Sequence, residues 1–98
     1  MPKHLLREIE KLKKQILAIG AVVEDSLHKA VRALQERDEK LAKRVIESDI
    51  EIDRMEVDME EDCLKVLALY QPVASDLRLI VAILKINSDL ERDRKSVV

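Results

Sequence analysis

The chain has 98 residues and a formal net charge of −2, from 18 basic and 20 acidic side chains, and this length predicts one small domain over residues 1–98. Apolar residues form 47% of the sequence, which is enough material for a folded core. With one glycine, two prolines and one aromatic residue, the composition suits long helices and excludes all-β and α/β folds.

The first predicted helix covers residues 3–36. Apolar residues recur there in steps of three and four, as on one face of a helix. They are Leu5, Ile9, Leu12, Ile16, Ile19, Val23, Leu27, Ala30 and Leu34. Gly20 lies in the middle, where it destabilises a helix by about 1 kcal/mol relative to alanine. We interpret this glycine as a site where a neighbouring backbone approaches closely.

The second predicted helix covers residues 39–69. Asp38 precedes it and has the short acceptor side chain that caps a helix start. Gln71-Pro72 ends it, because proline lacks the amide hydrogen and forces the preceding residue out of helical geometry.

The third predicted helix covers residues 73–95, with Pro72 suited to its first turn. Short connections between three long amphipathic helices predict an all-α, up-down-up antiparallel three-helix bundle. Leu79–Leu84 is apolar on every side, and two partner helices cannot cover such a segment completely. We therefore expect a second bundle or a second chain to pack on the third helix, most simply in a homo-oligomer such as a dimer.

Several partners and locations are excluded or favoured by composition. Interleaved charges offer no basic surface for nucleic acid. The longest apolar run, Leu79–Leu84, is far shorter than the roughly 20 residues needed to cross a bilayer. We expect no membrane insertion and a cytoplasmic location, since the lone Cys63 also fits a reducing compartment. Its apolar neighbours predict a packed side chain rather than a reactive nucleophile.

The second helix carries two apolar stripes when its residues are placed about 100° apart. The first stripe is Val45, Ile52, Met59, Cys63 and Val66, and the second is Ile46, Ile50, Val57, Leu64 and Ala68. Between them lies an acidic stripe of Asp49, Asp53, Glu56 and Glu60, with no basic residue among them. Like charges one turn apart repel, so an opposite charge is expected nearby.

Two kinds of positive charge can meet this need. A basic residue from the first or third helix is one. A hard cation such as Mg²⁺, Ca²⁺, Mn²⁺ or oxidised iron is the other, because such ions prefer oxygen ligands. In an antiparallel bundle the end of the third helix lies level with Asp49 and Asp53, which brings Glu91 within reach. We predict a metal site at Asp49, Asp53 and Glu91, with pairing of the third-helix acids to Arg92, Arg94 and Lys95 as the alternative.

No set of residues typical of an active site is present. The sequence has no nucleophile–base–orienter combination, no glycine-rich phosphate loop and no Cys/His zinc spacing. We expect no catalytic residues and no enzymatic activity.

Gln71–Arg78, of sequence QPVASDLR, and Asp89–Arg92, of sequence DLER, closely resemble the PhoU family of phosphate-uptake regulators. Asp49–Asp53 looks like the family's E/D-x-x-x-D motif. The resemblance implies a cytoplasmic, often oligomeric helical protein that restrains a high-affinity phosphate ABC transporter and its sensor kinase when phosphate is plentiful. It also implies metal sites, iron or another cation, on paired E/D-x-x-x-D motifs.

This chain departs from the family pattern in two ways. Family members usually carry two three-helix repeats, and this sequence has the equivalent of one, as in a single-repeat or truncated member. Lys95 occupies the second acidic position of the motif that begins at Glu91, and an ammonium can neutralise Glu91 but cannot bind metal. We therefore predict a non-enzymatic regulator of phosphate uptake with weakened metal binding. The alternative is a structural helical association domain without metal or signalling activity.

Overall fold

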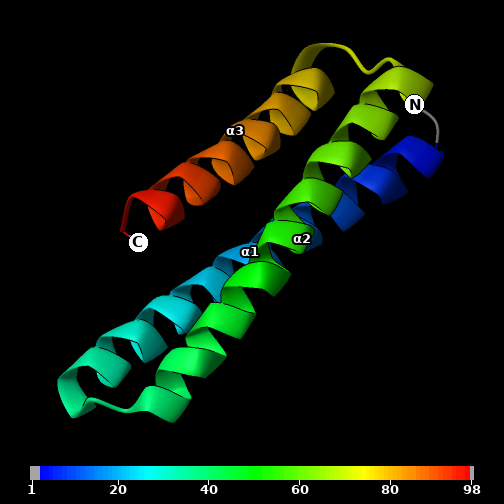
Figure 1. Ribbon diagram of the computed structural model, residues 1–98. Coiled ribbons are helices and arrows are strands. Elements are labelled where there is room, and N and C mark those ends of the chain that lie inside the picture. The colour runs from blue at the N-terminus through cyan, green and yellow to red at the C-terminus, as the bar shows by residue number, and fades with distance from the viewer. Residues whose placement is uncertain (1–2, 98) are drawn as a thin grey trace.

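Three antiparallel helices lie side by side in an elongated bundle with extents of 53 × 21 × 16 Å (Figure 1). The structure is a computed structural model that describes residues 3–97, with side chains described as far as Lys95. The helices are α1 (Lys3–Glu36), α2 (Glu39–Tyr70) and α3 (Ala74–Val97). The predicted all-α, up-down-up three-helix bundle is confirmed.

Local sequence explains how α1 ends and α2 begins. Arg37 has a left-handed φ of 52°, and the following amide, of Asp38, donates to the carbonyl of Ala33 at 3.0 Å. Asp38 then caps α2, because its side chain accepts a hydrogen bond from the amide of Leu41 at 3.1 Å. The expected capping role of Asp38 is therefore confirmed.

The connection between α2 and α3 differs slightly from expectation. Gln71 adopts a left-handed φ of 44° and its amide donates to the carbonyl of Leu67 at 3.1 Å, which closes α2. Pro72 is buried in the connection and lies before α3 rather than in its first turn. The reason is the backbone of Ala74, whose φ of 53° cannot occur inside a right-handed helix. Residues before Ala74 therefore cannot belong to α3, and the helix begins at Ala74.

One hydrophobic core receives side chains from all three helices. Its buried members are Leu5, Ile9, Leu12, Ile16, Ile19, Val23, Ile52, Met59, Cys63, Val66, Ile80 and Ile83. Gly20 departs from our interpretation, because no side chain beyond its chain neighbours and no other helix's backbone lies within 4 Å of the position that a Cβ would occupy there. The glycine therefore marks no close approach of a neighbouring backbone.

The buried face of α1 changes direction after Val23. Beyond this point Ser26 and Ala33 are buried, whereas Leu27 and Leu34, which the periodicity placed in the core, are 41% and 80% exposed. The cause is the length of α3, which has 24 residues against 34 in α1 and is about 15 Å shorter. Figure 1 shows that α3 ends alongside the middle of the α1–α2 hairpin. The last turns of α1 thus contact α2 alone.

The apolar segment Leu79–Leu84 of α3 is partly buried within the bundle itself, so less of it is exposed than its sequence suggests. Ile80 and Ile83 are buried, Leu79 and Leu84 are partly buried, and Val81 is 49% exposed. None of the helices within residues 3–97 has the combined length and apolar character of a membrane span.

Candidate functional site

The acidic stripe of α2 meets a single arginine from α3. Arg94 Nη1 donates to Asp49 Oδ1, and Arg94 Nη2 donates to Asp53 Oδ1. Nη2 also donates to Glu56 Oε1 at 2.5 Å. We call these four residues the Arg94 cluster. One guanidinium therefore serves three carboxylates, which follow one another along one side of α2.

Burial differs strongly within the Arg94 cluster. The side chains of Arg94 and Glu56 are 6% and 2% exposed, whereas those of Asp49 and Asp53 are 42% and 50% exposed. The two aspartates thus remain in contact with solvent. The Arg94–Glu56 pair is buried, so water and salt screen its two charges little. Each charge is therefore stabilised mainly by neighbouring charged groups of the protein.

The pKa values of the buried pair follow from this arrangement. Burial raises the pKa of Glu56 above its usual value, and the hydrogen bond and attraction of Arg94 offset this only in part. Burial alone would lower the pKa of Arg94, but its hydrogen bonds to Asp53, Glu56 and Asp49 outweigh burial and raise it. The guanidinium is therefore charged at neutral pH, as arginine side chains in proteins are.

Asn87 adds a second polar contact between α3 and α2. Its Nδ2 donates to the backbone carbonyl of Glu56 at 3.0 Å, and its side chain is 3% exposed. Among the described residues, three buried polar atoms have no hydrogen-bond partner: Glu56 Oε2, Asn87 Oδ1 and Arg94 Nε. Glu56 thus keeps one carboxylate oxygen without a donor inside the bundle.

The acids at the end of α3 pair with basic residues of their own helix. Lys95 Nζ lies 2.9 Å from Glu91 Oε1, and Arg92 Nη2 lies 3.0 Å from Asp89 Oδ1. The hydrogen bond to Glu91 also raises the pKa of Lys95. Lys95 therefore neutralises Glu91, as the departure from the E/D-x-x-x-D pattern suggested.

The predicted metal ligands are not brought together as one set. Asp49 and Asp53 share Arg94, whereas Glu91 pairs with Lys95. Within the part of the chain that the structure describes, no three His, Cys, Asp or Glu side chains are arranged to hold a metal ion. The arrangement favours neutralisation by basic side chains, the alternative that the acidic stripe left open. A bound metal at Asp49, Asp53 and Glu91 stays a prediction.

Two residues of this site escaped sequence reasoning. The sequence places Glu56 in the acidic stripe without marking it as buried, and it suggests Arg94 only as a partner for acids of α3. A signal was present, since Ile80, Asn87 and Arg94 follow one another at intervals of seven residues. This spacing places the two polar residues on the same side of α3 as the core.

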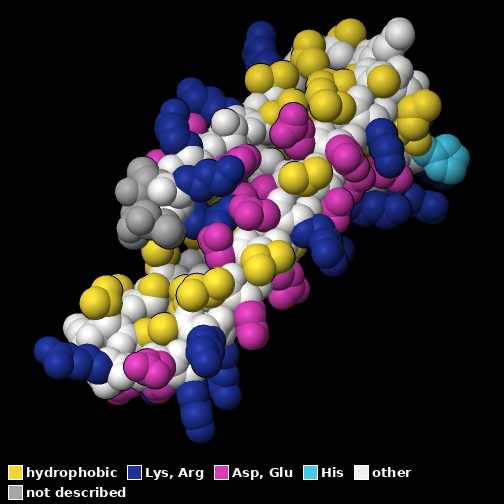
Figure 2. All heavy atoms as spheres, viewed as in Figure 1, with side chains coloured by type: hydrophobic (Ala, Val, Ile, Leu, Met, Phe, Trp, Pro, Cys, Tyr) yellow, Lys and Arg dark blue, Asp and Glu magenta, His cyan; other side chains and the backbone are white. Residues whose placement is uncertain are grey.

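A second feature of the surface is apolar. The first stripe of α2 is buried from Ile52 onward, but the second stripe stays exposed. Its larger members are Ile46, Ile50, Val57 and Leu64, which are 51–64% exposed. Leu64 also lines a groove of about 270 Å³ between α2 and α3, together with Leu84. Figure 2 shows apolar side chains interspersed with acidic ones on this face of the molecule. We call Ile46, Ile50, Val57 and Leu64 the outer stripe.

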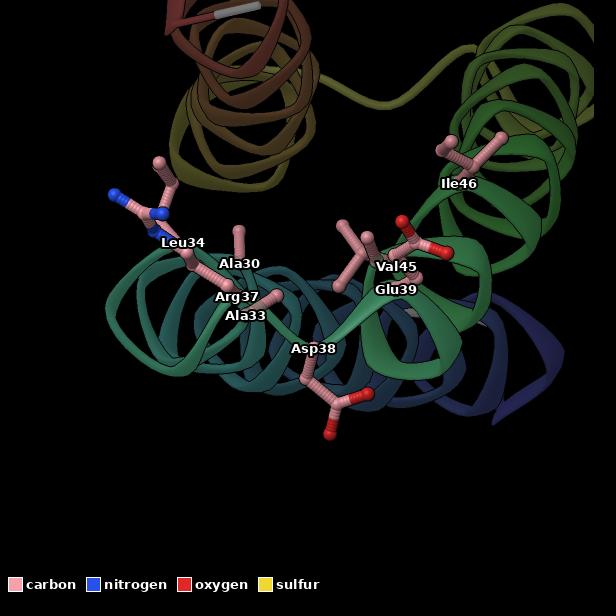
Figure 3. A pocket seen from close by; sticks show the side chains of 9 residues that line it. Ala30, Ala33, Leu34, Arg37, Asp38, Glu39, Val45 and Ile46 are labelled. Carbon is pink, nitrogen blue, oxygen red and sulfur yellow. The ribbon is translucent and has the colours of Figure 1, made fainter.

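A third feature is a hollow at the closed end of the α1–α2 hairpin, with a volume of about 430 Å³. Figure 3 shows residues of both helices around it, among them Ala30 and Leu34 of α1 and Val45 and Ile46 of α2. The hollow lies where α3 no longer covers the hairpin, and the exposed Leu34 is one of the residues that line it.

The comparison with protein families decides the classification. The family model described as the PhoU domain matches residues 16–92, which is most of the chain. This chain belongs to the PhoU family. The resemblance read from Gln71–Arg78 and Asp89–Arg92 is therefore confirmed, and Asp49, Asp53 and Glu91 lie inside the matched region. Arg94 and Lys95 lie just beyond it.

Individual PhoU relatives support this classification. The chain is 46% identical over 88 residues to the phosphate-specific transport system accessory protein PhoU homolog of Aquifex aeolicus, covering 90% of this chain and 40% of that protein. It is 44% identical over 85 residues to the accessory protein PhoU of Escherichia coli K12, covering 87% and 35%. It is 38% identical over 89 residues to PhoU homolog 1 of Thermotoga maritima, covering 91% and 38%.

The chain thus spans 35–40% of the length of these PhoU relatives. No solved structure matches the chain significantly.

Proposed function

We propose that this chain is a non-enzymatic regulator of phosphate uptake that acts by protein–protein contact with a phosphate transporter and its sensor kinase. The observation that carries the proposal is the 46% identity over 88 residues to an accessory protein of a phosphate-specific transport system. That identity extends over 90% of this chain, so it includes residues from all three helices.

The outer stripe is the contact surface in this proposal. Ile50 and Val57 are 63% and 56% exposed, and lie two turns apart on the same side of α2. Exposed branched apolar side chains in register along a helix are typical of a helix–helix interface. Leu64 of the outer stripe lines one groove with Leu84 of α3, so a partner helix can pack across both α2 and α3. A second copy of this chain presents the same surface, which favours a dimer as one form of the contact.

Phosphate uptake in cells tests the proposal. In a bacterium that lacks its own PhoU protein, we expect expression of this chain to lower the uptake of radiolabelled phosphate in phosphate-rich medium. The double variant Ile50→Glu, Val57→Glu should lose this effect while remaining folded by circular dichroism. Leu17→Glu is the matched control, because Leu17 is a 73% exposed leucine on α1, outside the outer stripe. Unchanged uptake with folded wild-type chain present would refute the proposal.

The oligomeric state separates this function from a purely structural association domain. Light scattering is expected to show a dimer of the wild-type chain that the double variant at Ile50 and Val57 dissociates. A chain that dimerises through the outer stripe but leaves phosphate uptake unchanged would favour the structural alternative.

A further inference from the structure

We propose that Arg94 is the built-in cation of the acidic stripe on α2, so that its guanidinium takes the place between Asp49, Asp53 and Glu56 that a metal ion would otherwise take. The inference concerns the chain's own charge balance and does not depend on the proposed function.

The geometry of the guanidinium is the first argument. Both of its terminal nitrogens donate to carboxylate oxygens. Nη1 donates to Asp49, and Nη2 donates to Asp53 and to Glu56. Arginine presents several donors in a rigid planar fork, which suits the simultaneous binding of carboxylates. A metal ion at the same oxygens would have to displace this fork. The position between the three carboxylates is therefore already occupied by positive charge.

Burial is the second argument. The Arg94 side chain is 6% exposed, and Glu56, at 2%, has an oxygen with no partner among the described residues. If the guanidinium were removed, Glu56 would remain as a buried charge without a counter-ion. Such a group is strongly destabilising until it takes up either a proton or a compensating cation. The spacing that the three carboxylates take around the guanidinium does not suit a metal ion. Once Arg94 is removed, the half-exposed Asp49 and Asp53 side chains can turn toward a cation that Glu56 Oε2 also contacts.

The position of Arg94 in α3 is the third argument. Arg94 lies in the last helical turn, where a positive charge is favoured by the helix dipole. It also connects the end of α3 to the middle of α2, across 38–45 residues of sequence. The same contact therefore neutralises the stripe and docks the end of the helix. A chain built in this way needs no metal to hold α3 in place.

Thermal unfolding with and without Mn²⁺ tests the inference. We expect the melting temperature of the wild-type chain to be the same in EDTA and in manganese chloride. Arg94→Ala should melt lower in EDTA, and manganese chloride should raise its melting temperature by about 4–8 °C. Adding Asp53→Asn to Arg94→Ala should abolish the rise. Arg94→Lys is the matched control, because it keeps a positive charge and should respond less than Arg94→Ala.

Titration calorimetry with Mn²⁺ gives the second readout. Arg94→Ala is expected to bind Mn²⁺ at least about tenfold more tightly than the wild-type chain does, a difference of about 1.4 kcal/mol. Two results would overturn the inference. One is a manganese-dependent stabilisation of the wild-type chain that Asp53→Asn removes, and the other is an Arg94→Ala variant that folds but gains no affinity.

A single variant without the Arg94 substitution keeps the test decisive if Arg94→Ala does not fold. Asp53→Asn in the wild-type background should change stability by the same amount in EDTA and in manganese chloride, because Asp53 acts there through Arg94. A change seen only with manganese would contradict the inference.

Discussion

Arg94 Nη2 lies 2.5 Å from Glu56 Oε1, and this contact joins the end of α3 to the middle of α2 inside the bundle. Both side chains are almost completely buried, and Arg94 supplies the positive charge that Glu56 meets inside the bundle. The pair explains how a helix with four acids on one side can pack against a neighbour. It also provides positions at which the structure can be tested separately from the function.

Removal of Glu56 should destabilise the fold. We expect Glu56→Ala to lower the free energy of unfolding by about 2–3 kcal/mol, because Arg94 stays buried and keeps only the half-exposed aspartates as partners. Urea denaturation followed by circular dichroism measures the change. Glu60→Ala is the control on the same acidic stripe, and because Glu60 is exposed it should stay within about 0.5 kcal/mol of wild type. Equal losses in the two variants would contradict the buried pair.

The pH dependence of stability should reveal the ionisation of Glu56. Burial raises the pKa of Glu56 above its usual value of 4.5, and Arg94 lowers it only in part. Between 4.5 and the raised value the folded chain binds more protons than the unfolded chain, so this group makes the protein more stable as pH falls through that window. The penalty for its ionised form is fully present above the raised value.

Comparison with Glu56→Gln isolates this contribution from those of the other acids. We expect the stability of wild type relative to Glu56→Gln to increase as the pH is lowered from about 7 to about 4.5. Urea midpoints at several pH values measure the difference. A difference that is constant or shrinks over this range would be inconsistent with a raised pKa at Glu56.

Gly20 offers a stabilising substitution. The position lies inside α1, its φ is not left-handed, and no other helix comes within 4 Å of the place of a Cβ. Gly20→Ala should therefore raise the free energy of unfolding by about 0.5–1 kcal/mol. Ala18→Gly, at an exposed position one half-turn earlier, should lower it by a similar amount. Destabilisation by Gly20→Ala would mean that a neighbour approaches the glycine after all.

Cys63 should be chemically inert while the protein is folded. Its side chain is completely buried, and burial, with a smaller effect from Asp62, raises its pKa to about 11. The thiolate that reacts with disulfide reagents is therefore nearly absent at neutral pH, and the reagent cannot reach the sulfur. We expect no reaction with Ellman's reagent in buffer and one thiol per chain in denaturing urea. Rapid labelling of the native protein would contradict the predicted packing.

The three helices could be predicted from local sequence because each signal acts over a few residues. Apolar periodicity marks the helices, Asp38 caps α2, and Gln71-Pro72 ends it, so the helix boundaries lie within two residues of expectation. The PhoU family could be recognised for the same reason, since Gln71–Arg78 and Asp89–Arg92 are contiguous segments that need no knowledge of packing.

The contacts of the candidate site, in contrast, could not be predicted from local sequence, because they require the position of α3 relative to α2. Two apolar stripes on α2 are equally visible in the sequence, but only packing decides that Ile52 is buried and Ile50 exposed. Likewise, the periodicity of α1 continues to Leu34, whereas the shorter α3 leaves Leu34 uncovered. Neutralisation of the acidic stripe requires a charge 38–45 residues away in the chain. Local patterns specify helices, but the partner of a buried charge is set by distance in space, which only the packed bundle establishes.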